Sequence, residues 1–197
     1  MAYDQNVISV AAGGTGSSSF GTSNGIIKYN GTNLVASTAT FDSSNRLTMA
    51  SQPSCLVAMA STVASVTGDG TVYTIIFDTS IYDQNSNFSL SGGTFTAPIA
   101  GIYLFTLNAT FTGLVVGNTT GSVIVDNGNV PFETEFNPVA SAVGGVATFS
   151  ITSCCILAAN QTFTPKVSIS GGTKSVGISG LSGSSRALTS FSCSKVA

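Results

Sequence analysis

A strict two-residue alternation between Gly101 and Thr112 constrains the fold more than any other feature of the chain. Successive side chains of a β-strand project to opposite faces of its sheet. The apolar positions are Tyr103, Phe105, Leu107, Ala109 and Phe111, and the polar positions are Thr106, Asn108, Thr110 and Thr112. The pattern therefore predicts a strand of about ten residues that is buried on one face only.

Other short apolar or alternating runs predict further strands, separated by turn residues. We expect strands at residues 55–60, 71–78, 121–126, 146–157, 162–170 and 186–196. Residues 71–78 are apolar on both faces, which predicts a strand that is covered on both sides or lies at a subunit contact. Residues 130–145, with two prolines, and the glycine-rich residues 171–185 are predicted to be loops. Because no window has the period and caps of a helix, the chain is predicted to be an all-β antiparallel sandwich or jelly roll.

Residues 1–50 differ in composition from residues 51–197, and we expect two regions with this boundary. The first region is rich in glycine, serine, threonine and asparagine, and its apolar runs are short. The Asn30-Gly31 dipeptide predicts one hairpin, and a second is expected to turn at residues 43–45. Isolated ribbons of this kind are marginal in water, so three copies wound together are one interpretation and a flexible linker is the other.

The chain is unusually poor in charge. Charged residues make up 7% of it, against about a quarter in typical soluble domains. So little charge, combined with a positive mean hydropathy, protects a protein poorly against self-association. The composition favours an oligomer, with a monomeric β domain as the alternative. Candidate aromatic residues for the subunit interface or the core are Tyr73, Phe77, Tyr103 and Phe191.

The residue types present argue against catalysis and against a bound metal or cofactor. The chain has no histidine, the commonest general base and the usual partner of a nucleophile. Glu133 and Glu135 are the only close pair of glutamates, and we interpret them as solvated loop charges rather than as a glycosidase pair. Neither a calcium loop nor the cysteine spacing of a zinc site is present. We therefore expect no enzyme activity, no cofactor and no metal site.

Nucleic acid and membrane are also unfavourable partners. The six basic residues are scattered along the chain rather than clustered as phosphate binding requires. No run of about 20 apolar residues is present that would span a bilayer. The first residues, MAYDQNVISVAAGG, lack the basic region and the long apolar core of a secretory signal.

Four cysteines are present, at Cys55, Cys154, Cys155 and Cys193. Cys155 and Cys193 fall in register with apolar neighbours, so buried free thiols are the first interpretation. A Cys55–Cys193 or Cys154–Cys193 disulfide is the alternative if the protein reaches an oxidising compartment.

The segment FSLSGGTFTAPIAGIYLFTLNATFTG, residues 88–113, also carries a resemblance to a known family. Its order T-F-T-A-P-x-x-G-x-Y-x-F resembles the central strand of the complement-one-q globular head, a jelly roll shared with the tumour necrosis factor superfamily. The residues that carry this resemblance are Phe95, Pro98, Gly101, Tyr103 and Phe105. The later segments CCILAANQTFTPKV and ALTSFSCS resemble two further strands of that fold, so the resemblance extends over about residues 52–197. It implies a tumour necrosis factor-like jelly-roll head that assembles as a homotrimer.

A second resemblance lies in the first region. The patterns A-A-G-G-T-G and N-G-I-I-x-Y-N-G-T are similar to short repeats of phage tail fibres. The two resemblances together imply a structural protein of a virion fibre or spike at the virion surface. Its head would attach to a host receptor or glycan, and residues 1–50 would anchor it to the virion base or to a neighbouring subunit.

Two other functions remain open. One is a self-assembling subunit of an extracellular filament or appendage on a cell surface, and the other is a carbohydrate-binding β-sandwich module. The turn at residues 158–161 lacks the Lys-Gly-Asp usual in the complement-one-q family, so no ligand, calcium or receptor residue of that family is assigned here.

Overall fold

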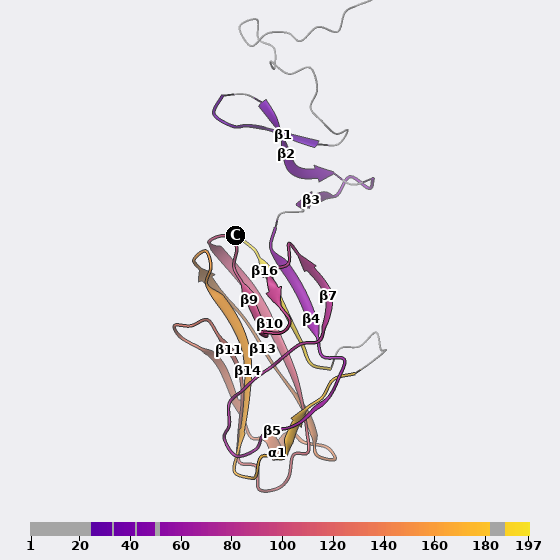
Figure 1. The fold of residues 1–197 in the computed structure, drawn as a ribbon, viewed down its shortest axis with the longest axis vertical. Helices are drawn as coiled ribbons and strands as arrows, with labels where there is room; N and C mark the ends of the chain where they lie inside the picture. Colours follow the sequence, from indigo (N-terminus) through magenta and orange to yellow (C-terminus); the bar gives the residue numbers. More distant parts are fainter. Residues whose placement is uncertain (1–24, 33, 42, 50–51, 182–187) are drawn as a thin grey trace, which may run out of the picture. The chain divides into compact units, whose positions relative to one another are not determined.

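The computed structural model describes residues 25–32, 34–41, 43–49, 52–181 and 188–197. The chain divides into two compact units, Met1–Gln52 and Pro53–Ala197. The described part of the first unit is a three-stranded antiparallel sheet, and the second unit is a sandwich of two antiparallel sheets (Figure 1). We call the second unit the head.

The sheet of the first unit consists of β1 (Gly25–Tyr29), β2 (Leu34–Phe41) and β3 (Leu47–Met49). In the first turn the Asn30 side chain accepts a hydrogen bond from the Thr32 N–H at 3.0 Å, and Gly31 has a φ of 98°. In the second turn Asn45 has a φ of 59°, a left-handed conformation that asparagine tolerates. Both predicted hairpins are confirmed. The A-A-G-G-T-G pattern at residues 11–16 lies outside the described residues.

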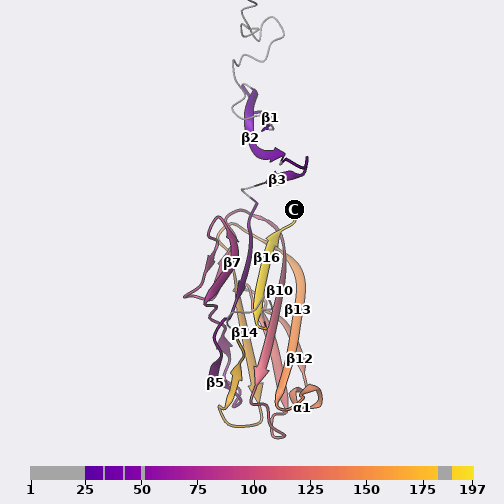
Figure 2. The same cartoon turned by 90° about the vertical axis from the view of Figure 1, so that its right-hand side faces the viewer.

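One sheet of the head has seven strands arranged around β10. They are β4 (Ser54–Ala58), β5 (Val63–Thr67), β7 (Thr79–Gln84), β10 (Gly101–Thr112), β13 (Val146–Leu157), β15 (Val176–Ile178) and β16 (Ser190–Lys195). β10 pairs with β13 along its whole length on one side, and with β16 and β15 on the other (Figure 2). β4 pairs with β16 and with the edge strand β7, and β5 pairs with β15.

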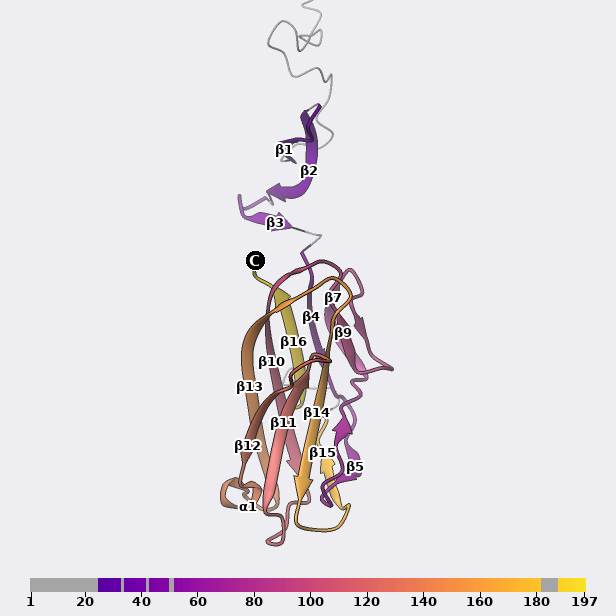
Figure 3. The same cartoon turned by 90° about the vertical axis from the view of Figure 1, so that its left-hand side faces the viewer.

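The other sheet of the head has six strands and faces the first one (Figure 3). They are β6 (Tyr73–Thr74), β8 (Phe88–Ser89), β9 (Thr94–Thr96), β11 (Thr120–Asp126), β12 (Phe132–Phe136) and β14 (Thr162–Ser170). Their order is β12-β11-β14-β9-β8, and β6 also pairs with β14. The short helix α1 (Pro138–Ser141) connects β12 to β13. The predicted all-β antiparallel sandwich is confirmed.

The core lies between the two sheets of the head. The five apolar residues of the β10 alternation are completely buried, as predicted. They pack against buried residues of the facing sheet: Phe95, Val123, Val125, Phe163, Val167 and Ile169. Full burial of one such side chain stabilises a fold by about 1.5–3 kcal/mol. Every described residue of this core lies at or after Cys55, so the head contains its own core.

The predicted strand at residues 71–78 is wrong. Only Tyr73 and Thr74 belong to a strand, β6, and the segment then leaves the regular ladder. The Ile75 N–H donates to the Pro165 carbonyl at 3.0 Å, but Pro165 has no N–H to return a hydrogen bond. Nor are both faces covered within the chain, because Val72 and Ile76 are exposed.

Residues 130–145 were predicted to be a loop, but they contain β12 and α1. Within FETEF the two phenylalanines are half-buried and the three residues between them are exposed, at the edge of the six-stranded sheet. Asn137 begins the helix, because its side chain accepts hydrogen bonds from the N–H groups of Val139 and Ala140. Pro138 follows at the first helical position, where proline is favoured.

Other strands were also not predicted correctly, and the short strands β8 and β9 are among those that the sequence did not indicate. The predicted loop 171–185 contains β15, whose three residues are buried against β10 and β5. Neither β5 nor β7 was expected from the sequence. The terminal strand was expected from residue 186, but β16 begins at Ser190, and residues 182–187 lie outside the described part of the chain.

Candidate subunit interface

The residues that carry the family resemblance lie in the core of the head and in the loop between β9 and β10. The rings of Phe95 on β9 and Tyr103 on β10 meet across the sandwich with centroids 5.7 Å apart. The Tyr103 hydroxyl donates to the Ile99 carbonyl at 2.8 Å, which fixes the loop that contains the exposed Pro98. Burial raises the pKa of the Tyr103 hydroxyl above its ordinary value. Phe95 and Tyr103 are therefore structural residues of the core.

Two other positions of the resemblance have equally local roles. A Cβ atom at Gly101 would lie 2.3 Å from Lys195 Cε and 2.4 Å from the Ala197 carbonyl oxygen. The start of β10 therefore has room only for glycine. The ring of Phe105 packs against Phe163 of β14 with centroids 4.7 Å apart, in the middle of the core.

Three of the four candidate aromatic residues lie in the core. Phe77, Tyr103 and Phe191 are at most 1% exposed, whereas Tyr73 is half-buried. Phe77 and Phe191 form an aromatic cluster with Phe88, with centroids 5.6–6.5 Å apart. Within a single chain, these rings hold the sandwich together.

The structure brings Cys55 and Cys193 together but separates Cys154 from both. Cys55 and Cys193 are opposite each other in the register of β4 and β16, buried on the core side. Cys154 is exposed on the other face of the same sheet, so the alternative Cys154–Cys193 pairing does not fit this fold. All four thiols are free. Burial, and to a lesser degree the charge of Asp83, raises the pKa of Cys55 to about 12, and burial also raises that of Cys193.

An uncharged surface covers the side of the seven-stranded sheet that points away from the core. It is made of the even-numbered residues of four adjacent strands, β13, β10, β16 and β4, which the register aligns on one face. We call this surface the outward face. None of these residues is an aspartate, glutamate, lysine or arginine. Lys195 and Asp83 belong to this sheet, but their register partners, Tyr103 and Cys55, are on the core side.

One end of the outward face is aliphatic. Ile102 and Ile156 are directly opposite each other in the register of β10 and β13. They are 37% and 76% exposed, and Leu104, two residues further along β10, is 43% exposed. Large aliphatic side chains that are adjacent and solvent-exposed favour a contact with another protein surface.

The middle of the outward face carries polar side chains that hydrogen-bond to one another. Thr106 shares a hydrogen bond with Thr152 at 2.9 Å, and Thr110 shares one with Thr148 at 2.8 Å. Between them, Asn108 accepts from the Ser150 hydroxyl at 2.5 Å and donates to Ser190 at 3.3 Å. Because these groups are already paired, a second surface can cover them without leaving a donor or acceptor unsatisfied.

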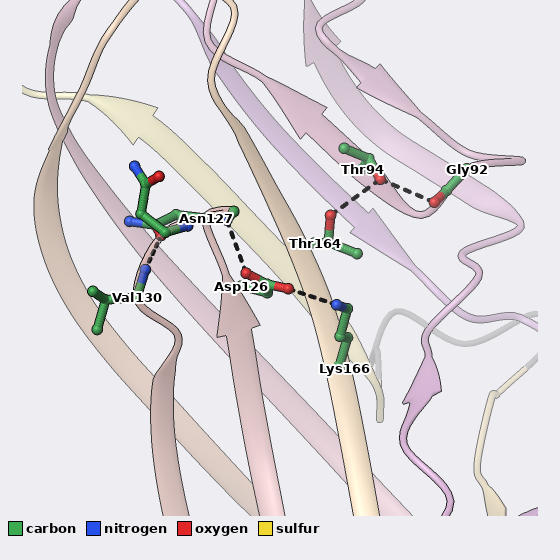
Figure 4. A network of polar contacts seen from close by, with 9 residues as sticks. Gly92, Thr94, Asp126, Asn127, Val130, Thr164 and Lys166 are labelled. Carbon is green, nitrogen blue, oxygen red and sulfur yellow. Dashed lines mark hydrogen bonds and ion pairs between the residues drawn. The ribbon is translucent and has the colours of Figure 1, made fainter.

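The opposite outer surface of the sandwich, on the six-stranded sheet, is charged (Figure 4). Lys166 forms an ion pair with Asp126 at 2.6 Å, and the exposed Glu133 and Glu135 lie on the neighbouring β12. The hydrogen bond from Lys166, together with one from the Gly128 N–H, lowers the pKa of Asp126. The two outer surfaces of the head therefore differ sharply in charge.

Further hydrogen bonds lie on either side of the Lys166–Asp126 ion pair. The Thr94 hydroxyl donates to the Gly92 carbonyl at 3.0 Å and shares a longer hydrogen bond with Thr164 (Figure 4). On the other side, the Asn127 side chain accepts from the Val130 N–H and closes the turn between β11 and β12. Each contact stabilises a turn or a strand pair.

Sequence reasoning missed the aliphatic end of the outward face. Ile102 and Leu104 occupy the same alternate positions as the polar residues of β10, at the start of the strand. An apolar residue in the polar half of an alternation is the signal that indicates them. Ile156 carries the same signal on β13.

Residues 58–145 match the model of the C1q domain family. The head is a C1q-like jelly roll. The solved structures similar to it include the globular domain of zebrafish complement 1qA, with 14% identity, 74% of this chain and 98% of that chain covered, and a TM-score of 0.45. Murine APRIL at pH 8.5 has 11% identity over 74% of this chain and 99% of that chain, with a TM-score of 0.49. No curated protein matches the chain.

No three histidine, cysteine, aspartate or glutamate residues among the described ones are placed to hold a metal ion. Within the same residues, no helix is long and apolar enough to cross a membrane.

Proposed function

We propose that this chain is a structural subunit of a virion fibre or spike, with a homotrimeric C1q-like head for host attachment. Residues 1–50 anchor the head to the virion base or to a neighbouring subunit. C1q-like and tumour necrosis factor-like domains are generally binding modules without enzymatic activity and typically form trimers. The observation that carries the proposal is the uncharged outward face of the seven-stranded sheet.

The difference in charge between the two outer surfaces supports the trimer. The outward face exposes Ile102, Leu104 and Ile156 and has no charge to keep it hydrated. The six-stranded sheet exposes the Lys166–Asp126 pair and two glutamates. If one surface of the head is covered by sister chains, this asymmetry places the uncharged face inside and the charged sheet in water.

Three copies related by a threefold axis satisfy this requirement with one kind of contact. A contact between two different surfaces closes into a ring when each copy is rotated by the same angle. The ring presents the same head loops three times. Repeated weak contacts with a host surface then add up through effective concentration, as an attachment head requires.

Substitution of a single residue tests the trimer. Leu104→Asp places a charge on the outward face, and Ile124→Asp makes the same change at a half-buried position on the outer side of β11 in the other sheet. We expect light scattering to give a monomer for Leu104→Asp and a trimer for both Ile124→Asp and the unsubstituted chain. Equal masses for the two variants would contradict the proposed interface.

Immunogold electron microscopy tests the location. Antibodies against the head are expected to label the ends of fibres or spikes that project from virus particles. Label along filaments on a cell surface would instead favour the extracellular filament, an alternative that the exposed apolar residues of β1–β3 also fit.

A further inference from the structure

We propose that β1–β3 of each chain are covered on both faces by β1–β3 of two sister chains, so that residues 25–49 form a closed three-chain β-structure. This inference rests on the proposed trimer and assigns a second, separate contact to it. We call the three strands the N-terminal sheet.

The N-terminal sheet is apolar on both of its faces. Ile27 and Tyr29 are on one face, because they alternate with Lys28 along β1. The β1–β2 register shifts between Gly25 and Ile27, and beyond this shift Gly25 pairs with Thr40 of β2. The next residue, Phe41, is therefore on the face opposite to Gly25. Leu47 of β3 is opposite Phe41 and shares its face, and Met49 follows Leu47 by two residues.

These apolar side chains are substantially exposed in the structure. Ile27 is 42% exposed, Tyr29 66%, Phe41 43%, Leu47 55% and Met49 47%. No residue of the N-terminal sheet belongs to the described core, which begins at Cys55. Three strands are the smallest sheet expected to be stable by itself, and here apolar side chains on both faces stay in water unless another surface covers them.

Two neighbours are what a sheet with two apolar faces needs. In a three-chain arrangement each N-terminal sheet has two sister sheets beside it, one for each face. Lys28 is the single charged residue within the three strands, so each chain brings only one charge to such packing.

The head also keeps the three N-terminal sheets close together. Only four residues separate Met49, the end of β3, from Ser54, the start of β4. An extended chain of this length spans less than about 20 Å. A trimer of heads therefore holds its three N-terminal sheets at an effective concentration in the millimolar range, roughly.

Lysine cross-linking of the full chain tests whether sister chains pack on the N-terminal sheet. Lys28 is the only lysine before Lys166, so a Lys28–Lys28 cross-link can form only between two chains. We expect this cross-link in the unsubstituted chain. Tyr29→Asp on one face and Leu47→Asp on the other should each abolish it, whereas the control Val116→Asp, at an 89% exposed position of the head, should keep it.

Hydrogen exchange of residues 25–49 in the same samples reports whether the sheet is formed. We expect both N-terminal variants to exchange at least about tenfold faster there than the unsubstituted chain, with no change in the head. Fast exchange in an unsubstituted trimer would overturn the inference. Slow exchange without the Lys28–Lys28 cross-link would also overturn it, because residues 1–24 of the same chain would then be the cover. A mass that keeps increasing with protein concentration would also overturn the inference, because the N-terminal sheets would then join separate trimers instead of closing within one.

The outcomes separate this inference from the proposed head interface. If the unsubstituted chain is a trimer and the N-terminal sheet is free, the inference is wrong and the head interface stands. If Leu104→Asp leaves the trimer intact and Leu47→Asp gives a monomer, the N-terminal sheet holds the chains together and the head interface is wrong.

Discussion

Phe136 and Phe149 stack face to face, with ring centroids 3.4 Å apart and ring planes 12° from parallel. Phe136 is the last residue of β12 and Phe149 is on β13, so the pair joins the edge strands of two different sheets. Phe111 of β10 lies beside both rings, with centroids 5.6 and 6.1 Å away. The three rings close one open edge of the sandwich.

Removal of one stacked ring should destabilise the head measurably. Loss of a buried phenylalanine costs about 3–5 kcal/mol, and because Phe149 is only half-buried we expect about 2–3 kcal/mol for Phe149→Ala. Urea unfolding measures this change, with Phe149→Leu as the milder control. A free energy of unfolding that stays the same within error would mean that the stacked pair does not hold the edge.

Gly121 should tolerate no larger residue. A Cβ atom there would lie 2.3 Å from Phe136 Cε2 and 2.7 Å from Ile169 Cδ1. We expect Gly121→Ala to lower the free energy of unfolding by about 1–3 kcal/mol, because the Phe136 ring must move out of its stack. Gly92→Ala is the control, since its nearest neighbour is the movable Ser89 hydroxyl. Equal stability of the two variants would contradict this packing.

The hydrogen bond between the Tyr103 hydroxyl and the Ile99 carbonyl should contribute a modest amount of stability. Tyr103→Phe removes the hydroxyl and leaves the ring in the core, so we expect a loss of about 0.5–1.5 kcal/mol. Thermal unfolding of the variant and the unsubstituted chain checks the value. A more stable variant would show that the hydroxyl is better hydrated than bonded.

The pH dependence of stability should reflect the buried thiols on the alkaline side. A thiol whose pKa is higher in the folded than in the unfolded state stabilises fully below its unfolded pKa of about 8.5, and the contribution is lost as pH rises above it. Burial raises the pKa of Cys55 to about 12 and that of Cys193 in the same direction, so unfolding should become easier above about pH 9.

Stability near neutral pH is the reference for the alkaline measurement. The chain has no histidine, so we expect urea midpoints to be nearly constant from about pH 6 to 8. The double variant Cys55→Ala/Cys193→Ala should be less stable at neutral pH but should lose less between about pH 8.5 and 10. The same alkaline slope in both proteins would assign it to other groups.

The sequence predicted the parts of the fold in which one strand face meets the core. The β10 alternation is visible because Tyr103 to Phe111 are buried on one side and hydrated on the other. β12 was missed because Pro131 and Pro138 on either side of it are typical of a loop. At residues 71–78 the strand ends where it meets Pro165, which has no N–H to donate to it. Pro165 is more than 80 residues away in the sequence, so the local pattern of residues 71–78 could not predict this end.

The candidate interface was harder to predict than the fold. Its aliphatic end joins Ile102 of β10 to Ile156 of β13, 54 positions later in the sequence, and only the strand register makes them neighbours. The same is true of Cys55 and Cys193, which the sequence proposed as one of two pairings and the register brings face to face. Three of the four aromatic candidates, Phe77, Tyr103 and Phe191, lie in the core of the single chain, and their burial there does not depend on how many chains assemble.

The native mass of the full chain at neutral pH, with and without reductant, tests the trimer most directly. One chain has a mass of 19.8 kDa, so three times this value, about 59 kDa, is expected under both conditions. The reductant should make no difference because the proposed contact is uncharged and noncovalent. A single species of 19.8 kDa that stays soluble at high concentration would contradict the assembly on which the proposed function depends.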